Sequence, residues 1–346
     1  MPYINIKPDP CYERLRDTLT LKKKADRPPL CDFSFSKHLM DATLGKKTRE
    51  KIWISCGKEE RRVLPADELD FFIAAGYDFV CTWPFYNFNV SGKHQIEGTG
   101  RIRTMDDLNK NEWPWDLAHR VNYGNMEEMA ALMPICMKII ILSHDIFTYV
   151  WENMGFTHFC NSLFEDEELV AELFRQIGKA VCEINERAAL AVGNKIGGLW
   201  YADDLAFNTG TFVNPDVYRK HLFPWVKKIG NLARELGVPF IYHSDGFLWD
   251  LFDDFYKMGV NAIHPLEPKS MDAQEVKAKQ GRRFCLIGNV DVDLLAQGEP
   301  DQIKEAVQSR ISSLGSNGGY CVGSSNTLPP YVKAENFKAM VEAAFG

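Results

Sequence analysis

Several kinds of sequence signal are absent from this chain of 346 residues. No apolar run reaches the ~18 consecutive residues that a membrane-spanning helix needs, and the N-terminus has no charged segment followed by an apolar one. The formal net charge of −7 gives no excess of basic residues of the kind that binds nucleic acid. We therefore expect a cytoplasmic protein that binds neither membranes nor nucleic acid.

The cysteines and glycines lack the spacings of common binding motifs. The nine cysteines are scattered and never form a Cys-x-x-Cys pair, which argues against a disulfide framework and a thiolate zinc knuckle. Gly288, Gly318 and Gly319 lack the fingerprint that cradles a dinucleotide, so no nucleotide cofactor is expected. No internal repeat, low-complexity run or linker interrupts the sequence, which favours one domain over residues 1–346.

The sequence does contain a series of short apolar runs that end abruptly in polar residues. Residues 238–242 are followed directly by His243-Ser244-Asp245-Gly246. Similar runs end in Asp203-Asp204, in His264, in Gly288-Asn289-Val290-Asp291 and in Gly323-Ser324-Ser325-Asn326. Buried parallel strands that alternate with helices and end in polar side chains are typical of an α/β barrel with its chemistry at one mouth. The sequence therefore predicts a single (β/α)8 TIM barrel.

The expected elements follow one another in the order that this fold requires. Strands are expected at 30–35, 77–82, 135–142, 196–201, 239–243, 260–264, 283–287 and 318–322. Helices are expected at 65–75, 146–154, 157–164, 165–192, 215–236, 247–258, 271–280, 300–314 and 332–344. A helical extension at 10–25 precedes the first strand, and an inserted strand or hairpin is expected within 45–64.

The least regular stretch, residues 87–125, is an insertion after the second strand. It contains a candidate hairpin at 94–104 and the cluster Trp113-Pro114-Trp115. An insertion of this length acts as a lid or pocket wall, or else is a packed surface excursion, and the sequence does not decide between these.

His243, Asp245 and Asp203 are the candidate catalytic residues. The i, i+2 spacing places His243 and Asp245 on one side of the chain if the strand stays extended, where they could share a metal ion or act together on a substrate. Imidazole and carboxylates bind zinc or a harder divalent ion, and Glu267 is the third candidate ligand. The alternative for Asp245 is a cap on the helix expected at 247–258.

Adjacent carboxylates at Asp203 and Asp204 point in opposite directions on an extended segment. One of them can face the mouth while the other caps a helix or pairs with an arginine. We assign Asp203 to acid–base chemistry and Asp204 to substrate binding. His264 is either a second imidazole in the pocket or a packed loop residue.

The remaining candidates for substrate binding lie at other strand ends. Asn289 and Asp291 either contact substrate or order the turn, and Asn326 is an additional oxygen donor. Trp83, Tyr86 and Tyr201 would form pocket walls for an aromatic or flat substrate, although core packing also explains such residues. His144 has no spacing partner and is interpreted as ordinary.

The C-terminal part of the chain resembles the uroporphyrinogen decarboxylase superfamily from about residue 130 onward. The resemblance is carried by these segments, in family order: Trp200-x-x-Asp203-Asp204, Pro215-x-x-Tyr218, His243-Ser244-Asp245-Gly246, Gly288-Asn289-Val290-Asp291, Gly318-Gly319-Tyr320 through Asn326, and Glu335-Asn336 with Met340. It implies a (β/α)8 barrel with one of two chemistries. One is cofactor-free decarboxylation of a tetrapyrrole, and the other is zinc-dependent methyl transfer that involves a corrinoid protein.

The residues differ from the decarboxylase pattern where that pattern holds the substrate. The family's strand-one arginines align with Ser34 and His38, and its aspartate after strand two falls near Trp83. Because a polycarboxylate would lose its bidentate guanidinium partners here, uroporphyrinogen decarboxylation is not expected.

The methyltransferases that this chain resembles carry His-x-Cys after strand five and a cysteine after strand eight. Here the imidazole is kept at His243, while Asp245 and Asn326 stand in place of the thiolates. We expect a methyltransferase that passes a methyl group from a small methylated compound to a separate corrinoid protein, with zinc or another divalent metal. A lyase acting on a smaller acid and a non-catalytic ligand-binding barrel are the alternatives, and the sequence leaves a homo-oligomer open.

Overall fold

The computed structural model describes residues 3–88, 100–110 and 117–346. Its main sheet has seven parallel strands in the order β11-β10-β9-β8-β5-β4-β3. The strands are β3 (Phe79–Thr82), β4 (Lys138–His144), β5 (Ile196–Ala202), β8 (Phe240–His243), β9 (Ala262–His264), β10 (Cys285–Ile287) and β11 (Tyr320–Cys321). Each lies within or next to a run predicted as a strand.

The segment 29–31 supplies the eighth side of the barrel. Leu30 forms an isolated parallel bridge with Val322, where Cys31 N donates to the Val322 carbonyl at 2.8 Å. The predicted strand 30–35 forms only two isolated bridges, Leu30 with Val322 and Phe35 with Leu328, and Asp32 is fully buried between them. Its carboxylate accepts hydrogen bonds from Ser324 and Tyr77, so it connects the segments beside β11 and β3. These features confirm the predicted (β/α)8 barrel.

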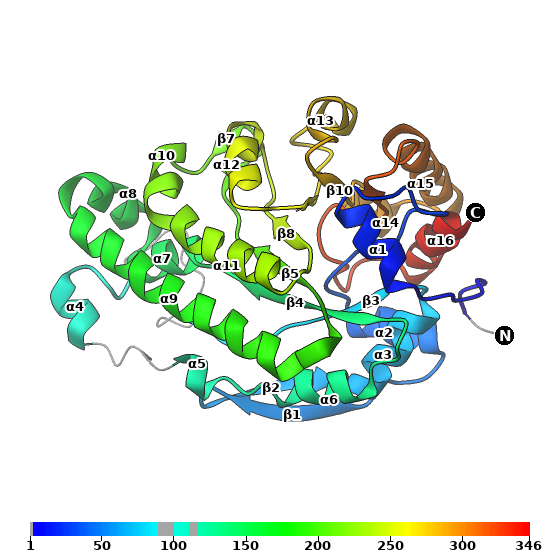
Figure 1. The fold of residues 1–346 in the computed structure, drawn as a ribbon, viewed down its shortest axis with the longest axis horizontal. Helices are drawn as coiled ribbons and strands as arrows, with labels where there is room; N and C mark the ends of the chain where they lie inside the picture. Colours follow the sequence, from blue (N-terminus) through cyan, green and yellow to red (C-terminus); the bar gives the residue numbers. More distant parts are fainter. Residues whose placement is uncertain (1–2, 89–99, 111–116) are drawn as a thin grey trace.

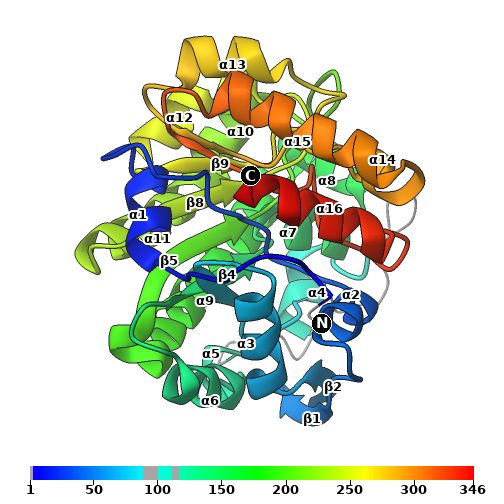
Figure 2. The ribbon, with the colours of Figure 1, turned by 90° about the vertical axis from the view of Figure 1, so that its right-hand side faces the viewer.

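Helices surround the sheet, and α4 lies farther out at the edge of the molecule (Figures 1 and 2). They are α1 (Tyr12–Leu19), α2 (Lys37–Leu44), α3 (Pro65–Ala74), α4 (Met105–Lys110), α5 (Leu117–Arg120), α6 (Gly124–Leu132), α7 (Phe147–Met154), α8 (Phe156–Glu165), α9 (Glu167–Val192), α11 (Phe223–Glu235), α12 (Phe252–Lys257), α13 (Ala273–Gln280), α14 (Val292–Gln297), α15 (Pro300–Leu314) and α16 (Ala334–Phe345). Within the part of the chain that the structure describes, no helix is both long and apolar enough to cross a membrane.

The helix predicted at 215–236 is divided into three pieces. It comprises α10 (Pro215–Val217), a π-helical turn (Tyr218–Leu222) and α11. Pro224 has no N–H for the hydrogen bond back to residue 220, which accounts for the wider turn just before it.

Two antiparallel hairpins accompany the barrel. β1 (Glu50–Ser55) pairs with β2 (Lys58–Val63), which confirms the hairpin expected within 45–64. The short pair β6 (Ala206–Phe207) and β7 (Gly210–Thr211) follows β5 and was not predicted. Most of the hairpin predicted at 94–104, together with Trp113 and Trp115, lies outside the described residues.

Small and large side chains alternate inside the barrel. Cys285 and Cys321 lie on neighbouring strands with their sulfur atoms 3.8 Å apart, and both are fully buried. Trp200 and Phe33 are also buried, and their rings meet edge to face with centroids 5.2 Å apart. These free thiols pack as small apolar groups and leave the polar side chains to the mouth of the barrel.

Candidate functional site

The polar cluster at the mouth follows from the strand register. Ala202 of β5 lies opposite His243 of β8, and His243 lies opposite His264 of β9. The ladder continues beyond the strands, because Asp203 N donates to the His243 carbonyl at 3.0 Å. The loops that follow these strands are therefore held together at one end of the barrel.

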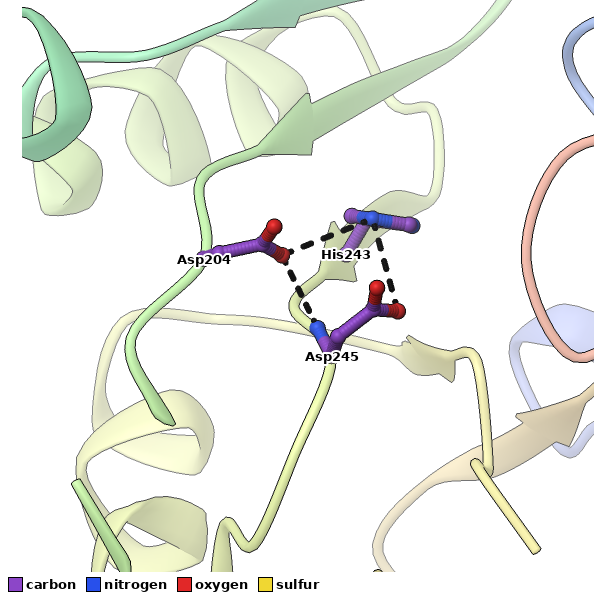
Figure 3. A group of neighbouring side chains, drawn as sticks. All are labelled: Asp204, His243 and Asp245. Carbon is purple, nitrogen blue, oxygen red and sulfur yellow. Dashed lines mark hydrogen bonds and ion pairs between the residues drawn. The ribbon is translucent and has the colours of Figure 1, made fainter. Parts of the chain in front are cut away.

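Asp204, His243 and Asp245 converge at this end (Figure 3). His243 Nε2 lies 3.7 Å from Asp204 Oδ1 and 4.0 Å from Asp245 Oδ1. The backbone N–H of Asp245 donates to Asp204 Oδ1 at 2.9 Å, which fixes the two acidic loops to each other. One potential ligand atom from each residue lies within 4.8 Å of the other two, so the three residues can share one small ion.

Several acidic side chains lie close together around the partly buried Asp245. Burial, and then the carboxylates of Asp204 and Glu267, raise the pKa of Asp245 to about 8, while a hydrogen bond from Asn326 opposes the rise. Asp245 Oδ2 accepts this bond at 2.6 Å, but the buried Oδ1 has no hydrogen-bond partner among the described residues. Burial also lowers the pKa of His243, against the carboxylates of Asp204 and Asp145.

This donor set fits a divalent cation. One imidazole and two carboxylates are ligands for zinc or a harder divalent metal, and a cation would compensate the unpartnered Asp245 Oδ1. Asp204, rather than the expected Glu267, is the third potential metal ligand beside His243 and Asp245. The Glu267 carboxylate lies in the next loop, where Oε2 accepts from Gly246 N at 3.0 Å and from Ser270 Oγ at 2.7 Å.

The capping alternative for Asp245 is not supported by the geometry. The predicted helix 247–258 begins only at Trp249, as a 3-10 turn (Trp249–Leu251) that leads into α12, and Leu248 stands at its N-cap. The side chain of Asp245 instead binds Asn326 from the loop after β11.

Asp203 points away from His243, and our assignment of the two adjacent carboxylates is therefore revised. Its oxygens accept from the N–H groups of Ile146, Phe147 and Thr148 at 2.9, 2.7 and 3.1 Å, at the start of α7. The Tyr201 hydroxyl adds a bond of 2.6 Å. Burial and the Asp145 carboxylate raise the pKa of Asp203 to about 7 despite these donors. This residue is a helix cap, and Asp204 faces the mouth.

Three of the candidates for substrate binding have structural roles instead. Tyr201 lies on the outer face of β5, where its ring packs edge to face on Tyr242. Asn289 donates to the Leu266 carbonyl at 2.8 Å and accepts from Arg310 Nε at 2.6 Å. Asp291 accepts from Asp293 N and caps α14.

The two aromatic residues after β3 also have defined partners. Trp83 is partly buried beneath Arg62 of β2, whose guanidinium lies 4.6 Å from the ring centroid. The Tyr86 hydroxyl accepts from His144 N at 2.8 Å and donates to its carbonyl at 2.9 Å. Trp83 is thus held against β2 and Tyr86 against the end of β4, and contact of either residue with a substrate stays a prediction.

His144 and Asp145 form a second acidic and imidazole pair that we did not expect. His144 Nδ1 lies 2.6 Å from Asp145 Oδ2, and the His144 ring stacks on Tyr86 with centroids 5.0 Å apart. Burial lowers the pKa of His144, but the Asp145 carboxylate more than compensates and the net change is upward. The signal was present in the sequence, because Ser143-His144-Asp145 ends an apolar strand just as His243-Ser244-Asp245 does.

Comparison with known proteins places the chain in a family. A methyltransferase from Methanosarcina mazei is similar over 97% of this chain and 99% of that chain, with 17% identity and a TM-score of 0.74, which shows a shared fold. A rutinosidase from Aspergillus niger matches at 12% identity over 77% of this chain and 75% of that chain, with a TM-score of 0.34 that is too low to inform the fold. No curated protein matches the sequence. The profile of the uroporphyrinogen decarboxylase (URO-D) family matches residues 143–345, and the chain belongs to this family.

Proposed function

We propose that this protein is a methyltransferase that moves a methyl group from a small methoxylated compound to the cobalt of a corrinoid carried by a separate protein. The observation that carries the proposal is the convergence of His243 Nε2 with carboxylate oxygens of Asp204 and Asp245 at the mouth of the barrel. The fold shared with a methanogen methyltransferase supports the same reaction class.

The transfer breaks the carbon–oxygen bond of the methoxy group. The reduced cobalt(I) of the corrinoid supplies the electron pair for the new cobalt–carbon bond, and the old bonding pair stays on oxygen, which then takes up a proton. Oxygen is a poor leaving group, so the reaction needs positive charge or a proton at that atom. A divalent metal held by His243, Asp204 and Asp245 would supply Lewis-acid assistance there.

The protein's own residues orient these groups. Asn326 binds Oδ2 of Asp245 and so leaves Oδ1 directed toward His243. Asp204 is fixed by the backbone N–H of Asp245 while about half of its side chain stays exposed, with a relative exposure of 47%. A substrate that enters the mouth would meet Asp204 first.

Decarboxylation of uroporphyrinogen is disfavoured by the residues that replace the family's arginines. Ser34 carries no charge, and both ring nitrogens of His38 are engaged, with the Val332 carbonyl and Ser36 Oγ, each at 2.9 Å. Without guanidinium partners the substrate's carboxylates would lose their charge-assisted hydrogen bonds.

A lyase that acts on a smaller acid is the second candidate. It is favoured by one observation, which is that the pKa of Asp245 is raised to about 8 by burial and neighbouring carboxylates. A carboxyl group that keeps its proton near neutral pH can serve as a general acid. Such a reaction would need Asp245 protonated and would not require a metal.

Metal analysis and a methyl-transfer assay distinguish the two candidates. Purified protein is assayed for bound zinc and for the change in absorbance when free cob(I)alamin is methylated by methoxylated aromatic compounds. We expect bound metal and transfer in the wild type, and loss of both in His243→Ala and Asp204→Asn. Removal of one of three protein ligands should weaken metal binding by at least ~100-fold.

Asp272→Asn is the matched control, because Asp272 caps α13 through Glu275 N and asparagine also caps helices well. It should bind metal and transfer methyl groups like the wild type. A metal-free protein that releases carbon dioxide from small acids, and loses this activity in Asp245→Asn, would replace the proposal with the lyase.

A further inference from the structure

A second imidazole lies directly behind His243. His264 Nδ1 is 2.7 Å from His243 Nδ1, and the two rings are 4.9 Å apart at an interplanar angle of 27°. His264 is fully buried, and His243 is only 7% exposed. The contact is therefore a hydrogen bond inside the barrel, on the side of His243 opposite the carboxylates.

His264 has an otherwise apolar environment. Phe33 contacts His243 and His264 edge to face at 5.2 and 5.4 Å, and Trp200 contacts His264 at 4.9 Å. Within the described part of the chain, His264 Nε2 is buried without a hydrogen-bond partner. His264 is fully buried among these rings and beside a second imidazole, where a charge would be costly, so its ring is neutral and carries one proton.

A neutral pair of rings can form this hydrogen bond in two ways. If His264 donates, His243 carries its own proton on Nε2, which lies 3.7 Å from Asp204 Oδ1 and 4.0 Å from Asp245 Oδ1. If His243 donates, its Nε2 lone pair faces those carboxylates and His264 must place its proton on the buried Nε2. The first arrangement is favoured when no cation is present, and the second is the one that lets His243 bind a cation.

We propose that His264 is a positioning residue that sets the tautomer of His243. Without a cation, His264 Nδ1–H donates and His243 is protonated at Nε2. With a cation on His243 Nε2, the bond reverses, so that His243 Nδ1–H donates and His264 carries its proton on Nε2. The two neutral rings hold two protons in both states, and the pair releases none when the ion binds. The second state rests on the proposed function, whereas the first does not.

Imidazole NMR of protein labelled with nitrogen-15 histidine tests this directly. We expect a single Nε2–H tautomer of His243 in the metal-free wild type, and conversion to Nδ1–H when zinc is added. His264→Phe keeps an apolar ring but removes the bond, so both tautomers of His243 should appear and zinc affinity should fall by ~10–100-fold. His264→Asn retains a polar group close to the position of Nδ1 and should recover most of the affinity.

His221→Phe is the control for loss of a buried histidine, because His221 is also 7% exposed but stacks on Phe174 of α9 and contacts Glu167. It should leave the His243 tautomer and zinc affinity unchanged. Thermal unfolding reports whether each variant folds, and His264→Leu replaces His264→Phe if the latter does not.

The inference is overturned if His243 has the same tautomer distribution in the wild type and in the variant that lacks the bond. It is also overturned if zinc binds the wild type while His243 keeps its proton on Nε2. A wild type that binds no zinc contradicts the proposed function instead, and the metal-free comparison of tautomers still decides the role of His264.

Discussion

Asp78 and Asp245 are two acidic residues at opposite ends of the barrel, and their surroundings differ. Asp78 precedes β3 at the base and is fully buried, with Oδ1 2.7 Å from Arg14 Nη1 and 3.7 Å from Arg27 Nη2. Asp245 follows β8 at the mouth, where its charged neighbours are Asp204 and Glu267. The base contains arginines beside its buried carboxylate, whereas the mouth places carboxylates together.

The pKa values of Asp78 and Asp245 differ because their charged neighbours differ. Burial raises the pKa of Asp78 to about 6, and Arg27 and Arg14 oppose the rise. The pKa of Asp245 reaches about 8, because burial and neighbouring carboxylates act in the same direction. A carboxylate paired with arginines stabilises the fold, whereas a carboxyl group beside other acids can bind a cation or a proton.

The largest effect on stability is expected at the base. Asp78→Ala removes the buried one of two carboxylates that Arg14 and Arg27 share, and the side chains of these arginines are only 7% and 12% exposed. Breaking a buried ion pair by removing one partner costs about 3–5 kcal/mol. Equilibrium unfolding in urea should show this loss, while zinc binding by the folded protein should be unchanged.

Both arginines retain Asp9 as a partner, at 2.7 Å from Arg14 and 2.9 Å from Arg27, and Arg14 also retains Asp26 at 2.9 Å. Arg14→Met is the companion variant, since it removes the charge and keeps the length of the side chain. A loss below 1 kcal/mol in Asp78→Ala would mean that the remaining acids replace Asp78, and the contrast between base and mouth would then fail.

A smaller loss is expected from Asp203→Ala. It removes the cap of α7 and leaves the N–H groups of Phe147 and Thr148 without their acceptor, while Ile146 N retains the Tyr201 hydroxyl at 3.0 Å. Loss of a helix cap costs about 0.5–2 kcal/mol, and metal binding should persist. Asp204→Asn should show the reverse pattern, with little change in unfolding and loss of metal. Equal loss of metal in both variants would contradict the separate roles of these adjacent residues.

Much of the barrel could be predicted because the relevant signal is local. Apolar runs that end in polar residues gave the strands and showed which of their ends carries the chemistry, and His243 and Asp245 followed from a spacing of two residues. The hairpin at β1 and β2 was also visible in its own sequence.

The remaining features depend on residues distant in the sequence. Which of Asp203 and Asp204 turns inward is decided by the free N–H groups at the start of α7, more than fifty residues earlier in the chain. Asn289 accepts a hydrogen bond from Arg310 of α15, and Tyr201 packs on Tyr242 at the outer face of the sheet. No local pattern specifies these partners, so residue type alone assigned all three to the pocket.

The smallest expected effect is that of Asp245→Asn, and it is a change in how the free energy of unfolding depends on pH. In the unfolded chain an aspartate loses its proton near pH 4. In the folded, metal-free protein the pKa of Asp245 is about 8, because burial and the acids beside it disfavour the charge. Between these pH values the native state binds more protons than the unfolded state, so this residue makes the free energy of unfolding fall as pH rises from about 4 to 8.

Asparagine cannot titrate and still accepts a hydrogen bond from Asn326. Urea unfolding at pH 5 and at pH 8 in the presence of a chelator should therefore show a flatter pH dependence in the variant, which becomes the more stable protein at pH 8. A parallel decline in both proteins would show that Asp245 is ionised in the empty site. Burial and the neighbouring acids would then not hold a proton on Asp245, and the contrast between the mouth and the base would fail.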